Sequence, residues 1–362
     1  MSRQRSCPSN TLLALLSGLQ LLGCSGKTVD VGHNSTGSTG PIFASSAPPA
    51  KGSSTAPFPV VSGEGDVISF VVDSSRLFWI ASDHNHNYPE QRLTPQMRRC
   101  EIADCLDSVV SWPLPSTDTG TPDSLTSFGH RLEWRDFEGT ALSSCDADDC
   151  TKQTLIDIGT DISLFAADST GTVIVAPVGG MYSCVANDCQ TGLSHLVPTA
   201  PSGESPFALS KTLPALDADY VYASDDRLVR FRRDGSAPFE VIASESAQVI
   251  VVQGDSVIWR NDADNTLKSC PKTGCSHPQV LVSGLQSSGE VVADAQFIYF
   301  TDRERLSRIP VAGGEAPTLL LEESYELQNL RVDEQNLYFT GTNCTASSDG
   351  DSHCTGISVI PQ

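Results

Sequence analysis

The sequence is poor in basic residues and lacks the short motifs on which several enzyme classes depend. Lys and Arg together number 23 against 44 Asp and Glu, so the formal net charge is −21. An acidic surface repels phosphate groups, which argues against nucleic acid as a partner. The sequence also contains no Gly-x-Ser-x-Gly elbow, no His-Glu-x-x-His pair and no phosphate-binding glycine-rich loop before a helix. These absences argue against the enzyme classes that use such motifs.

Long helical periodicity is missing, and no apolar run is long enough to cross a bilayer. The amino-terminal run, residues 12–22, has about half of the ~20 residues that a membrane-spanning helix requires. Arg3 and Arg5 precede this run, and Gly23 and Cys24 follow it. A positive start, a short apolar middle and a small residue at the cut form the layout of a secretory signal. We therefore expect residues 1–23 to be a signal peptide that is removed on export.

The end of this signal, Leu21-Leu22-Gly23-Cys24, resembles the bacterial lipobox. The resemblance implies that the Cys24 thiol receives a diacylglycerol, that the chain is cut before Cys24, and that the new amine is acylated. Two or more acyl chains hold a protein firmly in a membrane. Ser25 stands where an Asp would oppose sorting, so the resemblance implies an outer-membrane lipoprotein, facing the periplasm or the cell surface. The alternative is an ordinary signal cut elsewhere, with Cys24 a free thiol.

The segment after the signal has the composition of a linker. Residues 24–56 are mostly Gly, Ser, Thr, Pro and Ala, with almost no large apolar side chain. Such a segment cannot bury enough surface to offset the entropy of ordering it. We expect a flexible tether that separates the folded part from the lipid by roughly 30 Å. The folded part then comprises residues 57–362.

The cysteines predict a set of disulfides. Of twelve, Cys7 leaves with the signal and Cys24 is lipidated, which leaves ten in five neighbouring pairs: Cys100/Cys105, Cys145/Cys150, Cys184/Cys189, Cys270/Cys275 and Cys344/Cys354. Paired cysteines become disulfides in an oxidising compartment. A four-residue gap, found in all but the last pair, suits a β-hairpin in which the cysteines face each other across two strands. The alternative is metal sites, but zinc needs two pairs that converge on one ion.

Short apolar runs recur along the chain and predict a repeat. They are Leu77-Phe78-Trp79, Leu132-Glu133-Trp134, Val173-Ile174-Val175, Val221-Tyr222-Ala223, Val257-Ile258-Trp259, Ile298-Tyr299-Phe300 and Leu337-Tyr338-Phe339. Their mean spacing is about 43 residues. Repeats of ~40–45 residues with only strand signals indicate propeller blades of four strands each. We expect an all-β fold, a single β-propeller of seven blades. Six or eight blades remain as alternatives because the first step is long.

Each unit divides into four strands. The first often ends near an Asp, as in residues 67–73, 162–168, 213–219, 249–255 and 330–333, and the third ends at a cysteine pair or at a Gly- or Asp-bearing turn. The last unit lacks a fourth strand. The segment from Pro57 to Gly63 closely matches a fourth strand, Pro278 to Gly284, so we expect the amino-terminal strand to complete the seventh blade and close the ring.

One unit also resembles a known family. Ile298-Tyr299-Phe300-Thr301-Asp302, followed by residues 306–314, resembles a unit of YWTD-type and related six- to eight-bladed propellers. The version with cysteine hairpins is similar to repeat lipoproteins abundant in myxobacteria. The resemblance implies the fold and leaves the function open, because propellers include binders, scaffolds and enzymes.

Candidate site residues are few. A site is expected in the loops of one face or at the mouth of the central channel. His84 and His86, with Asp83, form the best metal candidate, against the alternative of a polar surface loop. Acidic clusters at Asp146–Asp149, Asp262–Asp264 and Asp349–Asp351 lack the calcium-loop frame and are interpreted as solvated loops. We therefore expect no metal and no cofactor.

These observations predict a binding or scaffold module, rather than an enzyme, with a protein or glycan ligand that the sequence does not identify. We expect a monomer that is attached to the membrane through its lipid. The alternative is an exported propeller enzyme, a lyase or a hydrolase, with its site at the channel mouth. A third hypothesis is a purely structural envelope protein.

Overall fold

The structure is a computed structural model. It describes residues 57–62, 66–82, 95–105, 107–114, 122–136, 139–157, 161–176, 180–185, 193–196, 212–286, 289–323, 326–341, 344–346, 352–354 and 356–362. The predicted signal, the tether and Cys24 lie outside these ranges, as do the candidate loop with His84 and His86 and the acidic cluster at Asp349–Asp351. The described elements are strands apart from one short 3-10 helix, η1 (Ile102–Asp104). No helix in these ranges is long and apolar enough to span a bilayer.

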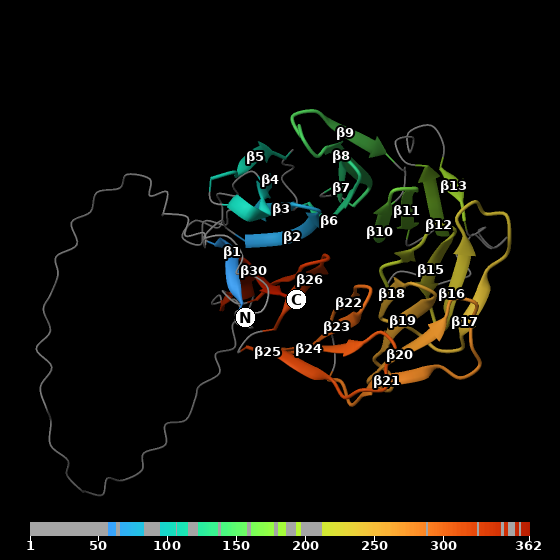
Figure 1. Cartoon of the computed structure of the whole chain (residues 1–362). Helices are drawn as coiled ribbons and strands as arrows, with labels where there is room; N and C mark the ends of the chain where they lie inside the picture. Colours follow the sequence, from blue (N-terminus) through green and yellow to red (C-terminus); the bar gives the residue numbers. More distant parts are fainter. Residues whose placement is uncertain are drawn as a thin grey trace, which may run out of the picture. The chain divides into compact units, whose positions relative to one another are not determined.

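The strands form seven four-stranded antiparallel sheets, the blades of a propeller (Figure 1). Blade 1 contains β2 (Asp66–Asp73), β3 (Arg76–Ser82), β4 (Gln96–Glu101) and β5 (Val110–Pro113). Blade 2 contains β6 (Asp123–Phe128), β7 (Arg131–Arg135), β8 (Ala141–Asp146) and β9 (Gln153–Asp157). Blade 3 contains β10 (Leu164–Asp168), β11 (Gly171–Ala176), β12 (Gly180–Val185) and β13 (Ser194–His195).

The later blades repeat this order. Blade 4 contains β14 (Ala215–Leu216), β15 (Tyr220–Ser224), β16 (Leu228–Arg232) and β17 (Glu240–Ala243). Blade 5 contains β18 (Val249–Gln253), β19 (Ser256–Asn261), β20 (Thr266–Pro271) and β21 (Gln279–Ser283). Blade 6 contains β22 (Val291–Ala293), β23 (Phe297–Asp302), β24 (Arg305–Pro310) and β25 (Thr318–Glu322). The predicted all-β, seven-bladed propeller is confirmed.

Blade 7 combines segments from two distant parts of the chain. It contains β26 (Gln328–Val332), β27 (Asn336–Thr340), β30 (Gly356–Pro361) and β1 (Phe58–Ser62), in that order across the sheet. Strand β1 pairs antiparallel with β30. A separate two-stranded hairpin, β28 (Cys344–Ala346) and β29 (Ser352–Cys354), lies between β27 and β30 in the sequence. That β1 holds the ring closed stays a prediction, and its test is given below.

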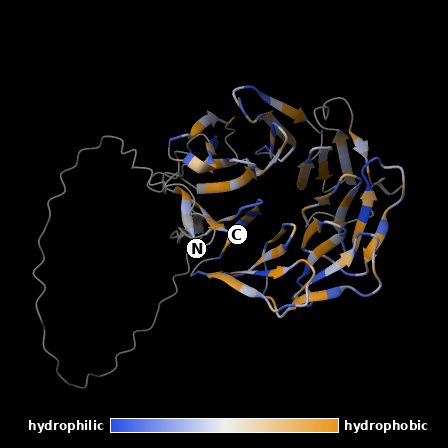
Figure 2. Cartoon of the chain, viewed as in Figure 1, coloured by the Kyte–Doolittle hydropathy of each residue, from blue (hydrophilic) through white to orange (hydrophobic). Residues whose placement is uncertain are grey.

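The hydrophobic core is divided among the contacts between neighbouring blades. Side chains alternate between the two faces of a strand. In β3, Leu77 and Trp79 therefore pack in a cluster with blade 7, whereas Phe78 and Ile80 pack in a cluster with blade 2. Seven such clusters are present among the described residues, one for each pair of neighbouring blades. Because both faces of the second strand of each blade are buried, these strands carry runs of mostly apolar residues instead of an alternating pattern (Figure 2).

Some predicted strand boundaries were wrong. Residues 213–219 were predicted as the first strand of a unit, but only Ala215–Leu216 pair as β14. Asp217 ends the strand because its side chain accepts hydrogen bonds from the backbone N–H groups of Asp219 (3.0 Å) and Tyr220 (2.8 Å). An aspartate that bonds its own following backbone favours a turn over a ladder. The apolar pattern alone did not separate the strand from this turn.

Candidate functional site

A cavity of about 570 Å³ lies where the innermost parts of all seven blades meet. Its lining comes from the first strand of each blade or the residues just before it: Ile68, Ser69, Val71, Ser124, Leu125, Thr126, Phe165, Ala166, Ala167, Leu213, Pro214, Gln248, Val249, Ile250, Glu290, Val291, Val292, Asn329 and Arg331. Because every blade contributes, this cavity is the central channel, the place where a site is expected in a propeller.

Most of the channel lining is apolar or small, and its charged members are Glu290 and Arg331. The Glu290 carboxylate accepts hydrogen bonds from the backbone N–H groups of Asn329 (2.5 Å) and Leu330 (2.6 Å). Asn329 has φ of 53°, in the left-handed region, where the register of β26 is irregular. Glu290, just before β22 in blade 6, therefore fixes this irregular segment of blade 7. Its carboxylate is a structural link between the two blades.

Arg331 presents a fixed cation to the channel. One guanidinium nitrogen lies 3.8 Å from the Glu290 carboxylate and donates a hydrogen bond to the Leu330 carbonyl oxygen at 2.8 Å. The guanidinium also lies 5.8 Å from the centre of the Phe70 ring in blade 1. Burial lowers the pKa of Arg331, and the Glu290 charge opposes that shift. An arginine remains protonated under these conditions. This group can bind a carboxylate or a carbonyl oxygen of a ligand.

A second cavity, of about 620 Å³, opens between blades 7 and 1. Blade 7 contributes the turn between β26 and β27, and blade 1 contributes the turn after β2 and part of η1. The lining residues are Ser74, Ser75, Ile102, Ala103, Asp333, Glu334, Gln335, Asn336 and Tyr338. Both turns join the first and second strands of their blades, so this cavity opens on one face of the propeller.

Three blades carry the same pairing of an aspartate with a tyrosine five residues later. The tyrosine hydroxyl donates to the aspartate carboxylate in blades 4, 6 and 7: Tyr222 to Asp217 at 3.0 Å, Tyr299 to Asp294 at 2.9 Å and Tyr338 to Asp333 at 2.8 Å. Burial, together with the neighbouring carboxylate, raises the pKa of each of these tyrosines well above its ordinary value. The pairs fix the turn between the first two strands to the second strand.

The same aspartate position also forms ion pairs with the next blade. Lys272 of blade 5 lies 2.8 Å from the carboxylate of Asp217 in blade 4, and Arg233 of blade 4 pairs with Asp168 in blade 3. Burial acts to raise the pKa of Asp217, but hydrogen bonds from Lys272, the turn backbone and Tyr222 outweigh it, so the pKa lies below its usual value. The pKa of Asp168 is lowered in the same way against the effect of burial, mainly by Arg233.

The disulfides Cys100–Cys105, Cys145–Cys150 and Cys270–Cys275 form as predicted, with Cα–Cα distances of 4.9, 5.0 and 5.9 Å. Each bridge lies in a hairpin between the third and fourth strands, as predicted, but its two cysteines do not face each other across these strands. The first cysteine is the last residue but one of the third strand, and the second lies in the connection before the fourth strand. In blade 2 the residue opposite Cys145 is Gln153. The connection is longer than a four-residue hairpin loop, and the bridge closes a loop within it. Disulfides indicate a protein that folds outside the cytoplasm.

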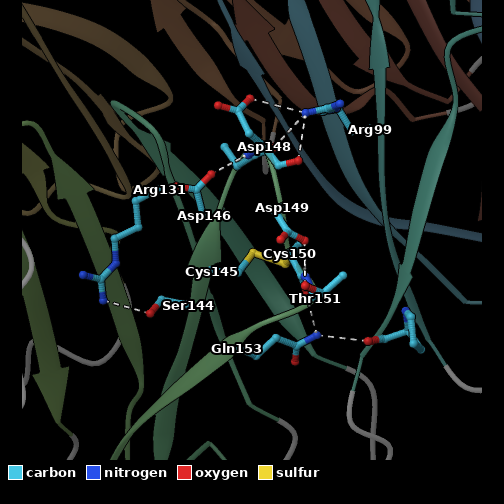
Figure 3. The surroundings of a disulfide bond; sticks show 12 residues. Arg99, Arg131, Ser144, Cys145, Asp146, Asp148, Asp149, Cys150, Thr151 and Gln153 are labelled. Carbon is cyan, nitrogen blue, oxygen red and sulfur yellow. Dashed lines mark hydrogen bonds and ion pairs between the residues drawn. A yellow bond between two sulfur atoms is a disulfide. The ribbon is translucent and has the colours of Figure 1, made fainter.

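The loop between Cys145 and Cys150 contacts the preceding blade (Figure 3). Arg99 of blade 1 donates to the Ala147 carbonyl oxygen at 3.1 Å and to the Asp148 carboxylate at 3.4 Å. Asp148 also pairs with Arg76 of blade 1. The acidic cluster Asp146–Asp149 thus contributes an interblade contact, and the disulfide helps to fix that contact.

The remaining predicted site residues are placed only in part. Cys184 on β12 is disulfide-bonded, and Cys189 lies outside the described residues. The backbones of Cys344 and Cys354 are opposite each other in β28 and β29, and their side chains are outside the description. In the second acidic cluster, Asp262–Asp264, Asp262 pairs with Arg260 (2.8 Å), and Asp264 pairs with Lys268. No group of three or more metal-ligating side chains occurs in the ranges that the structure describes.

The residues that shape the two cavities were missed in the sequence. Glu290 and Arg331 carry no motif, and they become neighbours only because blades 6 and 7 pack together. Asp333 was noted only as the end of a strand. The repeat itself held a usable signal, since Asp217, Asp294 and Asp333 each precede a tyrosine by five residues.

No protein-family model matches the chain, and no curated protein matches it. Among solved structures, it is similar to BamB from Moraxella catarrhalis, at 12% identity and a TM-score of 0.52, over 83% of this chain and 84% of that chain. It is also similar to a catalytically inactive virginiamycin B lyase from Staphylococcus aureus with Quinupristin. The identity is 10% and the TM-score 0.60, over 85% of this chain and 98% of that chain. PorZ of Porphyromonas gingivalis is similar at 8% identity and a TM-score of 0.54, over 81% of this chain and 38% of that chain. These likenesses show the fold.

Proposed function

We propose that this chain is an exported, lipid-anchored binding module whose propeller recognises a protein segment at the mouth of the central channel. The proposal rests on the hydrogen bonds of the two charged residues that line the channel, Glu290 and Arg331. Both oxygens of Glu290 are held by backbone N–H groups, so this carboxylate serves the fold. Arg331 remains as a fixed cation beside apolar lining such as Val292 and Leu213. A small number of placed polar groups in an apolar cavity is typical of a recognition site.

The construction of the ring supports a binding role. Three disulfides and the Asp–Tyr pairs fix turns within their blades before any ligand arrives. Such preorganisation reduces the entropy lost on binding. PorZ is a bacterial surface component of a secretion system, which is one setting in which this fold is used. The likeness to a lyase keeps catalysis at the channel mouth as the alternative, but at 10% identity it supports only the fold.

Export and anchoring rest on the sequence and on the disulfides. The predicted lipid on Cys24 would attach the propeller to the membrane through residues 24–56. Mass spectrometry of the mature protein should find a triacylated Cys24 as the first residue. A Cys24→Ala variant should leave the detergent phase, and a variant that still partitions there would contradict the anchor.

Two equally exposed leucines allow the binding site to be tested. Leu213 lines the channel and is 55% exposed, whereas Leu155 lies on the outer strand β9 of blade 2 and is 59% exposed. The oxidised full-length protein would be immobilised, and envelope proteins that bind it would be identified by mass spectrometry and purified. We expect Leu213→Asp to weaken direct binding of the purified partner by about tenfold or more, and Leu155→Asp to leave it unchanged.

The outcomes separate the hypotheses. Loss of binding in Leu155→Asp alone would indicate a binding site on the outer strand of blade 2 and would contradict a site at the mouth of the channel. If no envelope protein or purified glycan binds the wild-type protein, the binding function itself is wrong. Chemical alteration of a bound ligand, detected as a mass change that Arg331→Gln abolishes, would favour the enzyme.

A further inference from the structure

The channel lining contains a cation that the blade repeat does not require. Arg331 lies opposite Tyr338, the middle residue of the apolar run of blade 7. In the other six blades, the first-strand residues opposite the middle of that run are neutral: Val71, Thr126, Phe165, Ala215, Val251 and Val292. A charged side chain is costly to place in a mostly apolar lining. The reason for this exception therefore lies either in the packing of blade 7 or in a ligand.

The contacts of Arg331 within the protein use only one side of its guanidinium group. Nη1 donates to the Leu330 carbonyl oxygen at 2.8 Å and lies 3.8 Å from the Glu290 carboxylate. The group also lies over the Phe70 ring, 5.8 Å from the ring centre. In the part of the chain that the structure describes, no acceptor receives a hydrogen bond from Nε or Nη2. The side chain is 36% exposed, so the Nε–Nη2 edge is available to a ligand in the channel.

This unused edge has the donor arrangement that a carboxylate accepts. Nε and Nη2 present two parallel N–H groups, which match the two oxygens of one carboxylate. Glu290 does not fill this place, because it lies on the Nη1 side and each of its oxygens accepts a backbone N–H from blade 7. Arg331 is the one cation in the lining. A dianion such as a phosphate would leave a charge unpaired, so a single carboxylate fits best.

The construction of the channel favours the end of a chain over a segment from its middle. The first strands of all seven blades surround the cavity of about 570 Å³. A segment that enters and leaves by one mouth needs room for two backbones side by side, whereas a chain end brings one. Val292 of blade 6 and Leu213 of blade 4 line the same cavity as Arg331. A carboxylate bound at Arg331 would therefore place the last side chains of the ligand against apolar lining.

We propose that the channel binds the carboxyl terminus of a partner protein, with the terminal carboxylate held by the Nε–Nη2 edge of Arg331 and apolar side chains in the last positions. This inference rests on the proposed function and narrows it from a protein segment to a chain end. Arg331 then determines specificity, because its two donors distinguish a free carboxylate from an amide. Leu213 contributes to the affinity for either form.

Peptide libraries test the carboxylate directly. The probe is a fluorescent hexapeptide library with varied apolar residues in the last two positions, prepared in free-acid and amide forms, and it is added to the oxidised full-length protein. We expect the free acids to bind about tenfold or more tightly than the amides. In Arg331→Gln both forms should bind with the affinity that the amides have for the wild-type protein, which also shows that the variant is folded. Arg331→Lys keeps the charge without the paired donors and should lose most of the preference.

Two further variants serve as controls. Arg308 also lies over an aromatic ring, that of Phe297 at 4.3 Å, but it is not part of the channel lining. Arg308→Gln should therefore keep the full preference for the free acids. Leu213→Ser removes apolar surface from the channel without adding a charge, so it should weaken the binding of both forms to the same extent.

The possible outcomes separate this inference from the proposed function. Equal binding of free acids and amides to the wild-type protein, or a preference that survives Arg331→Gln, would overturn the inference. If Leu213→Ser then weakened both forms, the channel would still be a binding site. An amidated library with an internal glutamate that binds as tightly as the free acids would assign Arg331 to a side-chain carboxylate and would also contradict the chain end. If no library binds, the inference is wrong, and the envelope partner and Leu213→Asp decide the proposed function.

Discussion

Blades 5 and 4 form the same turn between their third and fourth strands, one with a disulfide and one without. In blade 5 the N–H of Gly274 donates to the Pro271 carbonyl oxygen at 2.8 Å, inside the Cys270–Cys275 loop. In blade 4, Gly235 makes the equivalent bond to Arg232 at 3.0 Å. Both glycines have positive φ, 94° and 67°, which glycine adopts at little cost. A glycine is thus sufficient for this turn, and the disulfide of blade 5 reinforces a turn that the backbone already favours.

In blades 1 and 2 the connection after the third strand is bridged by a disulfide and has no glycine to form the turn. Their connections, Cys100 to Cys105 and Cys145 to Cys150, contain no glycine. In blade 2 the Asp146 carboxylate accepts the N–H of Asp148 at 2.8 Å, which organises the turn in another way. The Asp–Tyr pairs occur in blades 4, 6 and 7, and the disulfides that the structure places occur in blades 1, 2 and 5. Among the ties whose two partners the structure describes, the disulfides and the Asp–Tyr pairs therefore lie in different blades.

The largest expected effect comes from blade 7, whose outer strand is not supplied by the adjoining chain as it is in blades 4 to 6. A chain that starts after Ser62 loses Val60 and Val61, which are 6% and 3% exposed, and leaves the edge of β30 unpaired. We expect the free energy of unfolding, measured in urea, to fall by more than about 4 kcal/mol. A chain that starts at Pro57 is the control. Equal midpoints for the two chains would show that β1 does not hold the ring closed.

The second effect distinguishes the disulfides of blades 2 and 5. Replacing both cysteines of either loop with alanine should cost about 2 kcal/mol through the entropy of the unfolded chain. In blade 2 the loss should be greater, because the freed loop also loosens the Asp148 contacts with Arg76 and Arg99. Urea unfolding gives the two values. Hydrogen exchange should increase at Ala147 in the first variant and stay slow at Gly274 in the second. A larger loss of unfolding free energy in the blade 5 variant than in the blade 2 variant would contradict this expectation.

A smaller effect concerns the Asp–Tyr pairs of blades 4 and 6. Tyr299→Phe removes the hydroxyl that donates to Asp294 and should cost about 1–2 kcal/mol. Tyr222→Phe should cost less, because Lys272 still pairs with Asp217. Thermal unfolding of the two variants provides the measurement, with Tyr220→Phe as a control beside the second pair. Equal losses would show that the lysine does not compensate.

The smallest effect is the pH dependence of the ion pair between blades 4 and 5. The pKa of Asp217 is lowered in the folded protein, so its contribution to stability is present above its usual pKa of about 3.9 and is lost as the pH falls through the lower folded value. Lys272→Gln should reduce stability at pH 7 by up to about 1 kcal/mol, and the difference should shrink on acidification. A difference that persists when Asp217 is protonated would reflect packing and not charge. Urea unfolding across the acid range measures it.

The success of the sequence prediction depended on how local each feature is. Runs such as Leu77-Phe78-Trp79 identified the middle strands because both faces of these strands are buried. The match between residues 57–63 and 278–284 identified β1 as a fourth strand, and β1 pairs in blade 7. The prediction failed at Asp217, where one side chain ends the strand, and at Cys105, Cys150 and Cys275, which lie before the fourth strand and not on it.

The sequence by itself determined the repeat, the strand quartets and the cysteine pairs, because each depends on residues close together in the chain. Tertiary structure alone decided which side chains meet between blades. Glu290 meets Asn329 and Leu330, and Lys272 meets Asp217, because separate blades pack side by side. The channel lining likewise exists only once the first strands of seven blades converge. Contacts of this kind depend on the curvature and closure of the whole ring, which no local pattern of residues encodes.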